Sequence, residues 1–399
     1  MSLSHPKNLF SCILAAVFVL TFAGRASSGE ESNMHIGAIE FHPFASVEQT
    51  YDTNISLEPS GREDEDFITD FRLGMKINAP LAPQREEDFM MELSYEADVV
   101  RFWDHDERDR VDHSASGLLD LSFTNDFRLM IEDNFDRTED PQDSERADLD
   151  KRFRNTIDTS LSYDREKIRI MGGYRAIRDD YDDLENLDRT DNMFTGALFY
   201  QLAPKTAVFA EYNYGFISYD TNRTNSNSEY HQARLGLEGN LLPKVKGIVK
   251  AGYRTVGYDA NNKEDFSGFT LLGNIIYNAT ERTVINLSAE MTSEESSYST
   301  NSYYEANIVK IALDHQLLER FWLNGGGFYG RNRYPDATTE SSAVRKRRDD
   351  LWGLNAGMKY EIKRWCFISA DYEFKERDSN FAAFDYTDHI VSAEISFIF

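Results

Sequence analysis

Residues 89–99 read FMMELSYEADV, a stretch in which apolar and polar side chains alternate. The apolar parity runs from Phe89 to Val99, and the other parity carries Glu92, Glu96 and Asp98. Such alternation predicts a β-strand with one apolar and one polar face. The strand is longer than the ~5–6 residues usual in soluble sheets, and about ten tilted residues are what a strand needs to cross a bilayer.

The same period of two recurs along the chain, for example at residues 71–77 and 352–362. Segments with this pattern start near residues 38, 67, 88, 113, 127, 153, 167, 192, 206, 230, 245, 267, 282, 304, 320, 351, 365 and 388. They number about eighteen, and bacterial single-chain barrels have an even number of strands.

The connections between these segments alternate in length. Short ones fall at 79–85, 124–126, 164–166, 203–205, 242–244, 278–281, 316–319 and 363–364, and longer polar ones at 136–151, 178–190, 220–228, 293–301 and 333–349. Short turns on one side and long loops on the other are typical of the periplasmic and extracellular ends of an outer-membrane barrel.

The predicted fold is therefore all-β: a transmembrane antiparallel up-and-down β-barrel of about 18 strands. Lipid offers no hydrogen bonds to the backbone, so a closed barrel is the one kind of sheet that can span it. A soluble propeller should repeat a blade motif, which this sequence lacks, and a soluble sandwich should have shorter strands.

Both ends of the chain suggest secretion to the outer membrane. Lys7, the apolar run 9–22 and a small-residue site ending at Ala26 predict a signal peptide over residues 1–26. A short periplasmic segment at 27–37 and a barrel at 38–399 would follow. The last strand alternates up to Phe397 and Phe399, the pattern that outer-membrane assembly machinery reads, so these two residues are the expected assembly signal.

The composition excludes several other classes. Mean hydropathy is −0.56, and no segment after the signal peptide is long and apolar enough for a spanning helix. The net charge of −26 makes nucleic acid an unsuitable partner. After cleavage Cys366 would be the one remaining cysteine, so no intramolecular disulfide is expected. Aromatic residues near strand ends predict interfacial girdles: Tyr51, Trp103, Tyr163, Tyr200, Tyr212, Tyr253, Tyr277, Trp352 and Tyr372.

No pattern predicts catalysis, a cofactor or a metal centre, and we expect a protein that is not an enzyme. His113 lies near Ser114 and Ser116, but both serines have the opposite parity and should point to the other face. The acidic runs at 139–150 and 178–191 could bind divalent cations, although solvated loop surface is the better interpretation. The basic cluster at 345–348 could bind anionic sugars or lipid, or serve as a solubilising loop tip.

The polar parity should line a water-filled lumen, because a barrel of sixteen to eighteen strands encloses water rather than packed side chains. Both signs of charge occur there in comparable number, with the excess acidity in the loops. The predicted lining residues are Arg72, Lys76, Glu92, Glu96, Asp98, Arg128, Glu132, Arg169, Arg175, Arg234, Lys250, Arg254, Lys359, Glu361, Asp371 and Glu373.

Residues 43–58, PFASVEQTYDTNISLE, resemble the opening strand of a family of outer-membrane β-barrel porins associated with exopolysaccharide or exosortase loci. The hairpin rhythm and the final strand are also similar, so the resemblance covers the predicted mature chain. It implies a channel that exports an exopolysaccharide. Because few residues separate the predicted cleavage site from the first strand, separate periplasmic polysaccharide-export proteins would deliver the polymer.

Two other functions stay open: a general diffusion porin for small hydrophilic solutes, and an outer-membrane enzyme or adhesin. The absence of a catalytic pair in the sequence disfavours the last. A balanced lumen favours a neutral or lightly charged polymer, with a weak cation preference arising from the loops. Expected partners are outer-membrane lipid, lipopolysaccharide and the barrel assembly machinery.

Overall fold

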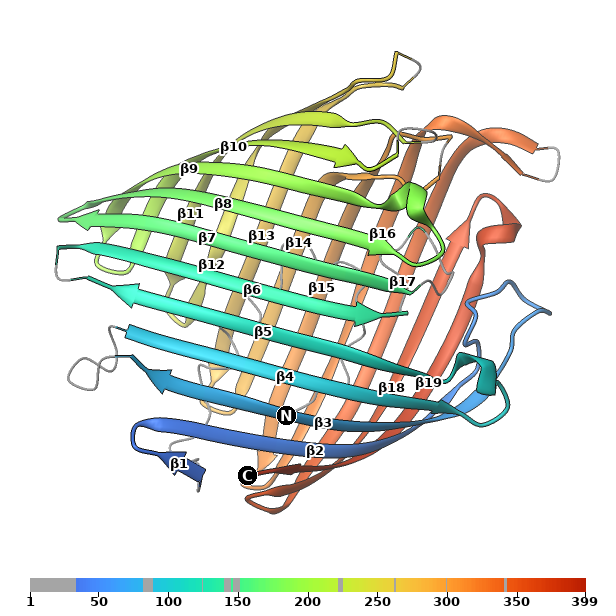
Figure 1. Cartoon of the computed structure of the whole chain (residues 1–399), viewed down its shortest axis with the longest axis horizontal. Helices are drawn as coiled ribbons and strands as arrows, with labels where there is room; N and C mark the ends of the chain where they lie inside the picture. The colour runs from blue at the N-terminus through green and yellow to red at the C-terminus, as the bar shows by residue number, and fades with distance from the viewer. Residues whose placement is uncertain are drawn as a thin grey trace.

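The computed structural model describes residues 34–81, 89–123, 125–139, 145, 151–221, 225–261, 263–298, 300–340 and 343–399. Within these residues, strands β2 to β19 form a closed antiparallel barrel of 18 strands (Figure 1). The prediction of an up-and-down barrel of about 18 strands is therefore confirmed. The predicted signal peptide and its cleavage site lie outside the described residues.

Each strand pairs with its neighbours in the sequence, and most strands begin within a few residues of the predicted position. The strands are β1 Met34–Ile36, β2 Ile39–Asp52, β3 Asp66–Pro80, β4 Phe89–Phe102, β5 Arg110–Ser122, β6 Phe127–Thr138, β7 Arg152–Arg165, β8 Ile168–Tyr181, β9 Arg189–Ala203, β10 Thr206–Tyr219, β11 Ser228–Leu242, β12 Val245–Tyr258, β13 Phe266–Thr280, β14 Thr283–Glu295, β15 Tyr303–Leu318, β16 Phe321–Glu340, β17 Ala343–Lys363, β18 Cys366–Ser379 and β19 Tyr386–Ile398. The described residues also include the short 3₁₀ helices η2 Asp106–Arg108, η3 Glu185–Leu187 and η4 Ala382–Phe384.

The barrel closes where the last strand pairs with the first full-length one. β19 and β2 are antiparallel neighbours from Ile390↔Asp52 to Ile398↔Phe44. Residues 51–55, a motif within the porin-like stretch 43–58, extend the seam at its Asp52 end: the Thr53 amide donates to the His389 carbonyl at 3.1 Å, and the buried Asn54 side chain donates to the Thr387 carbonyl at 3.0 Å. The conformation of this motif therefore depends on the closed barrel.

The alternation of short turns and long connections is confirmed by the strand boundaries. Short turns lie at the left-hand end of the barrel in Figure 1, and η2 and η3 lie at the other end. Glu166 and Lys244 adopt left-handed backbone conformations, with φ of 54° and 64°, in two of these turns. β1 pairs with the start of β2 through Met34↔Phe41, which places part of the expected periplasmic segment against the barrel.

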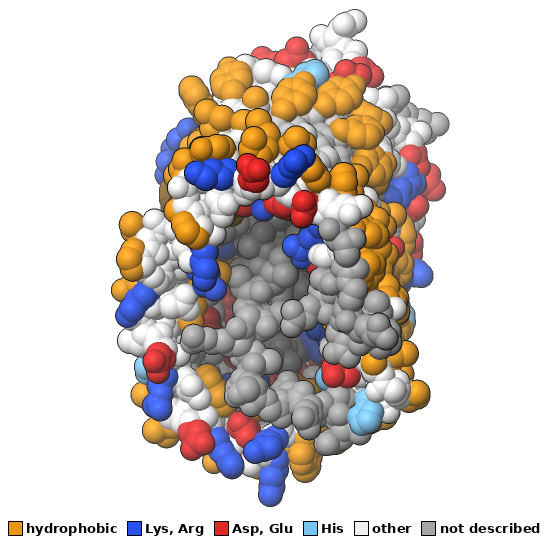
Figure 2. Space-filling view, turned by 90° about the vertical axis from the view of Figure 1, so that its left-hand side faces the viewer, with side chains coloured by type: hydrophobic (Ala, Val, Ile, Leu, Met, Phe, Trp, Pro, Cys, Tyr) orange, Lys and Arg blue, Asp and Glu red, His pale blue; other side chains and the backbone are white. Residues whose placement is uncertain are grey.

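The outer face of the barrel is apolar. Exposed large hydrophobic side chains occur on one parity of most strands, such as Phe71 and Leu73 on β3 and Leu93 on β4. Figure 2 looks onto the short-turn end and shows hydrophobic side chains along the flank and charged side chains around the rim of the central hollow. The expected girdle aromatics are exposed or half-exposed, and Trp103, Tyr212 and Trp352 are the most exposed of them.

Tyrosine hydroxyls on this apolar face find partners diagonally across the strand pair. Tyr95, Tyr212 and Tyr372 bond the Nδ1 atoms of His113, His231 and His389 at 2.8, 2.7 and 2.9 Å. His113 therefore makes its hydrogen bond to Tyr95 on the outer face. Ser116 bonds Ser94 through their hydroxyls, so the prediction that His113 and its neighbouring serines face apart is confirmed.

The expectation of a loop at 333–349 is wrong. β16 and β17 continue to pair through this region as far as Glu340↔Ala343, with a register shift between Arg333 and Ala337. Polar residues occupy both parities of this hairpin, including the buried Arg347 and Asp349, so no alternation is visible in the sequence. Thr338, Thr339 and Val344 still supply β-branched side chains that favour the extended strand.

The face assignment predicts that Leu93→Arg destabilises the barrel by ~2–4 kcal/mol, the cost of a cation facing the hydrocarbon core. Leu93 is 41% exposed on the outer face. Glu96→Arg on the same strand places the same side chain on the inner face beside Asp98, and should cost much less. Urea unfolding in lipid vesicles, followed by the heat-dependent gel shift, measures both; equal costs would contradict the assignment.

Candidate pore lining

All of the predicted lining residues have the parity of the inner face. Register shows this on β3 and β4, where Arg72 pairs with Asp98 and the outward Phe71 pairs with Val99. An ion pair between Arg169 on β8 and Glu238 on β11 gives independent evidence that these side chains point inward. These strands are separated by β9 and β10, and side chains can meet over two intervening strands at 2.5 Å on the concave side of a curved sheet.

Arg72 is the centre of a charge cluster on the wall formed by β19, β2, β3 and β4. Its guanidinium lies 2.8 Å from Glu48, 2.9 Å from Asp70, and 3.5 Å from both Asp98 and Glu394. All five side chains are largely buried. One cation thus faces four carboxylates contributed by four adjacent strands, which leaves this part of the wall acidic.

Most other predicted residues also have partners on the inner face. Lys76 pairs with Glu92 at 3.0 Å, Arg175 with Asp158 at 2.6 Å, and Glu373 with Lys375 at 3.1 Å. Glu211 binds two cations, Lys250 at 3.0 Å and Arg234 in a close ion pair. Arg128 makes a close ion pair with Asp120. Arg254 and Lys359 lie over the rings of Tyr230 and Phe367, while Asn134 and Asn324 donate to Glu132 and Asp371. Glu96 and Glu361 are half-buried.

Several inward-facing carboxylates near the seam were not among the predicted lining residues. Glu48, Asp52, Asp388 and Glu394 lie on β2 and β19, and Asp66 and Asp70 lie on β3. Their parity was readable in residues 44–52, 66–72 and 386–396, but the predicted lining set did not include them. With them included, the wall from β19 to β5 is acid-rich, while cations gather on the wall from β7 to β12: Arg152, Arg154, Arg169, Arg175, Arg189, Arg234, Lys250 and Arg254. The two signs are therefore segregated between walls, which the sequence-based prediction of a mixed lining did not address.

Glu145, in the connection between β6 and β7, contacts a distant part of the barrel. Its carboxylate accepts hydrogen bonds from the Ser296 hydroxyl and the Ser297 amide, both at 2.6 Å. Its carbonyl accepts bonds from Arg347 on β17 at 3.4 Å and Arg377 on β18 at 3.3 Å. Glu145 is fully buried, so the interpretation of its acidic run as solvated surface is wrong at this residue.

The basic cluster at 345–348 and the acidic run at 178–191 also contain buried residues that make ion pairs within the barrel. Arg347 is 2% exposed, pairs with Asp349 at 2.7 Å and lies over the Phe384 ring, so it is not part of a solubilising tip. Asp179 in the second run is bound by Arg154 and Arg189 at 2.5 and 3.2 Å. In the described ranges, no group of three or more His, Cys, Asp or Glu side chains could hold a metal ion.

The fold and its charged inner face define a porin-like outer-membrane barrel. The chain belongs to the family described as "Putative beta-barrel porin 2", whose model matches residues 30–399. No curated protein matches the sequence. Among the described residues no helix is long and apolar enough to cross a membrane.

The chain is also similar to several solved structures. The outer membrane protein opdK from Pseudomonas aeruginosa has a TM-score of 0.45 and 9% identity, covering 90% of this chain and 99% of that chain. OccAB3 from Acinetobacter baumannii has a TM-score of 0.48 and 11% identity, covering 91% and 100%. The siderophore receptor PirA from Pseudomonas aeruginosa has a TM-score of 0.44 and 11% identity, covering 89% and 80%.

The cluster around Arg72 predicts that Arg72→Gln increases cation selectivity. The four carboxylates would lose their shared counter-charge, so the potential along this wall should become more negative. Reversal potentials in planar bilayers should shift toward the cation value at low salt and less at 1 M, where the Debye length falls to about 3 Å. Arg101→Gln, an exposed cation on the outer face of β4, is the matched control. Unchanged selectivity for Arg72→Gln would place the ion path away from this wall.

Proposed function

We propose that this barrel is a non-enzymatic outer-membrane channel through which an exopolysaccharide leaves the cell, delivered by separate periplasmic proteins. The resemblance of residues 43–58 to exopolysaccharide-associated porins supports a polysaccharide as the transported molecule. Membership of the porin family supports the role of a channel. A signal peptide at 1–26 would route the chain through the inner membrane, and Phe397 and Phe399 would be recognised by the barrel assembly machinery. Lipid and lipopolysaccharide would surround the outer face.

The observation that carries the proposal is the pairing of inner-face cations. Arg72, Arg175, Arg234 and Lys250 each lie within ion-pair distance of at least one carboxylate. The wall therefore offers many hydrogen-bonding groups and little uncompensated positive charge. A neutral, hydroxyl-rich polymer suits such a wall, because it can exchange hydrogen bonds with the paired charges without meeting a net potential that repels it. A polyanion would be repelled by the acid-rich wall.

One contact favours the second candidate, a diffusion porin for small hydrophilic solutes. Glu145 brings the connection between β6 and β7 to β17 and β18, elements well separated from it around the barrel. Such a contact narrows the opening of the barrel at its long-loop end. A narrow path suits small solutes better than a chain with several sugars in cross-section.

Planar-bilayer recordings with the purified protein should separate these functions. We expect an open-channel current with brief blockades by neutral dextran fragments, because a polymer threading the lumen excludes ions. A polyuronate of the same length should block far less often, since the acid-rich wall repels it. Liposome swelling with monosaccharides but no dextran blockade would favour the diffusion porin, and strong anion selectivity at high salt would contradict the proposed role of the lining.

A further inference from the structure

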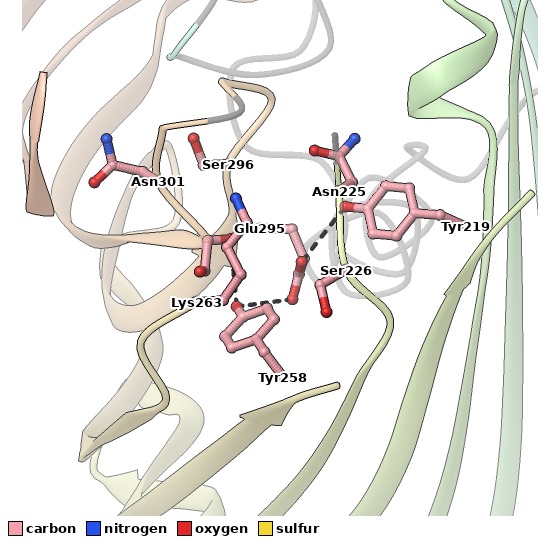
Figure 3. Close-up of a pocket in the computed structure, with 9 residues that line it drawn as sticks. Tyr219, Asn225, Ser226, Tyr258, Lys263, Glu295, Ser296 and Asn301 are labelled. Atoms are coloured by element: carbon pink, nitrogen blue, oxygen red, sulfur yellow. Dashed lines mark hydrogen bonds between the residues drawn. The ribbon is translucent and has the colours of Figure 1, made fainter. Parts of the chain in front are cut away.

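Many charged side chains at the long-loop end of the barrel are satisfied within the molecule. In the small pocket of Figure 3, the Glu295 carboxylate accepts hydrogen bonds from the Tyr258 hydroxyl at 3.0 Å and the Tyr219 hydroxyl at 3.4 Å. On the outer face of β8, both terminal nitrogens of Arg178 donate to the Asp220 carboxylate, at 2.8 and 2.7 Å. The hairpin of β16 and β17 differs from these examples.

Four cations lie on the outer face of this hairpin, which projects from the long-loop end in Figure 1. They share the outward parity of Trp352 and form what we call the outer basic patch: Arg331, Arg333, Lys346 and Arg348. Asp350 is shared by two of them, since it accepts a hydrogen bond from Arg331 at 2.6 Å and lies 3.5 Å from Arg348. Asp378 on β18 lies opposite Asp350 at the edge of the patch. Cations therefore outnumber the carboxylates beside them.

Two of the four cations have no counter-charge of their own. Arg333 and Lys346 are both exposed, and neither makes an ion pair with any carboxylate in the part of the chain that the structure describes. Glu305 on β15 is in register with Arg333 without pairing with it. Arg333 also lies directly opposite Arg348, and like charges in opposite positions destabilise an antiparallel strand pair. An anion bound between the two guanidinium groups would remove this repulsion.

The backbone beneath the patch is held by Asn380, which follows β18. Its side chain donates to the Lys346 carbonyl at 2.8 Å and accepts from the Arg348 amide at 3.0 Å, and its own amide donates to the Arg348 carbonyl at 3.0 Å. On the opposite face of the strand, Arg347 is buried over the Phe384 ring. The strand that presents the cations is thus fixed without a ligand, which lowers the cost of binding one.

The aromatic residues below the patch indicate its level in the membrane. Tyr329 and Trp352 are exposed on the outer face and pack edge to face, with ring centroids 5.0 Å apart. Such aromatic side chains are enriched at the membrane–water interface. Arg331 is two residues beyond Tyr329 and Arg333 is four, which corresponds to about 7 and 13 Å along a strand. The patch therefore lies at the level of lipid headgroups, above the hydrocarbon.

We propose that the outer basic patch binds phosphate groups of lipopolysaccharide in the outer leaflet. The long loops of such barrels are extracellular, so this leaflet surrounds the patch. Lipopolysaccharide carries phosphates on the sugars just above its acyl chains, and a guanidinium group can bind a phosphate through two parallel hydrogen bonds. The outward parity directs the four cations to lipid rather than to a solute in the lumen. The inference is independent of what the channel transports.

Native mass spectrometry on the full chain in detergent tests the patch, with a purified rough lipopolysaccharide as the probe and EDTA present. EDTA removes divalent cations, so the bound lipid then reports direct contacts with basic side chains. The wild type should bind at least one molecule. Arg333→Gln and Lys346→Gln should weaken binding about fivefold each and about 25-fold together, since each removes one basic residue from an anionic membrane surface. The same lipid stripped of its phosphates should bind the wild type no better than the intact lipid binds the double variant.

Arg178→Gln is the control, because it changes the net charge by the same amount. Arg178 lies four residues beyond the exposed Tyr174, as Arg333 lies four beyond Tyr329, but its charge is already bound by Asp220. This variant should bind lipopolysaccharide like the wild type.

The patch variants should fold normally, because the replaced side chains make no ion pair in the described structure; the heat-dependent gel shift checks this. No binding by the wild type, wild-type binding by the double variant, or an equal loss in Arg178→Gln would overturn the proposal. Equally tight binding of the dephosphorylated lipid, or tighter binding of phosphatidylglycerol, would overturn it as well.

Discussion

The seam between β19 and β2 is the interaction on which the rest of the structure depends. In lipid an unpaired strand edge would leave a row of backbone groups without partners, each costing several kcal/mol. Pairing from Ile390↔Asp52 to Ile398↔Phe44 removes both edges at once. Thr53 and Asn54 extend the seam beyond the regular ladder by bonding the backbone of the last strand. The motif by which the chain resembles a porin family is thus explained by closure of the barrel, without any contact to a solute.

Closure also divides the side chains into two environments with opposite requirements. Outward residues meet hydrocarbon, so the polar atoms of tyrosines there need partners on neighbouring strands, as Tyr95 has in His113. Inward residues meet a confined aqueous space in which charges are close to one another. Ion pairs between neighbouring strands, such as Lys76 with Glu92, reduce the repulsion that a crowded wall of like charges would otherwise create.

Period-two alternation was sufficient to predict the class of fold, the number of strands and the face of each lining residue. It could not predict which side chains meet across the barrel, because parity specifies a face and carries no information on neighbours several strands away. Arg169 with Glu238, and Glu145 with Ser296, are contacts of this kind. The extension of β16 and β17 was missed for a different reason: beyond the membrane both faces of a hairpin are polar, so the pattern disappears while the strand continues.

The separation of charge between walls has a consequence for how any solute would cross. Carboxylates are concentrated on the wall near the seam and cations on the wall from β7 to β12, where ion pairs such as Arg189 with Asp179 and Lys250 with Glu211 compensate positive charge. Net selectivity between ions then depends on which wall carries more uncompensated charge. Near the seam that balance is set by Arg72, the one cation within 3.5 Å of both Asp98 and Glu394 among the described side chains.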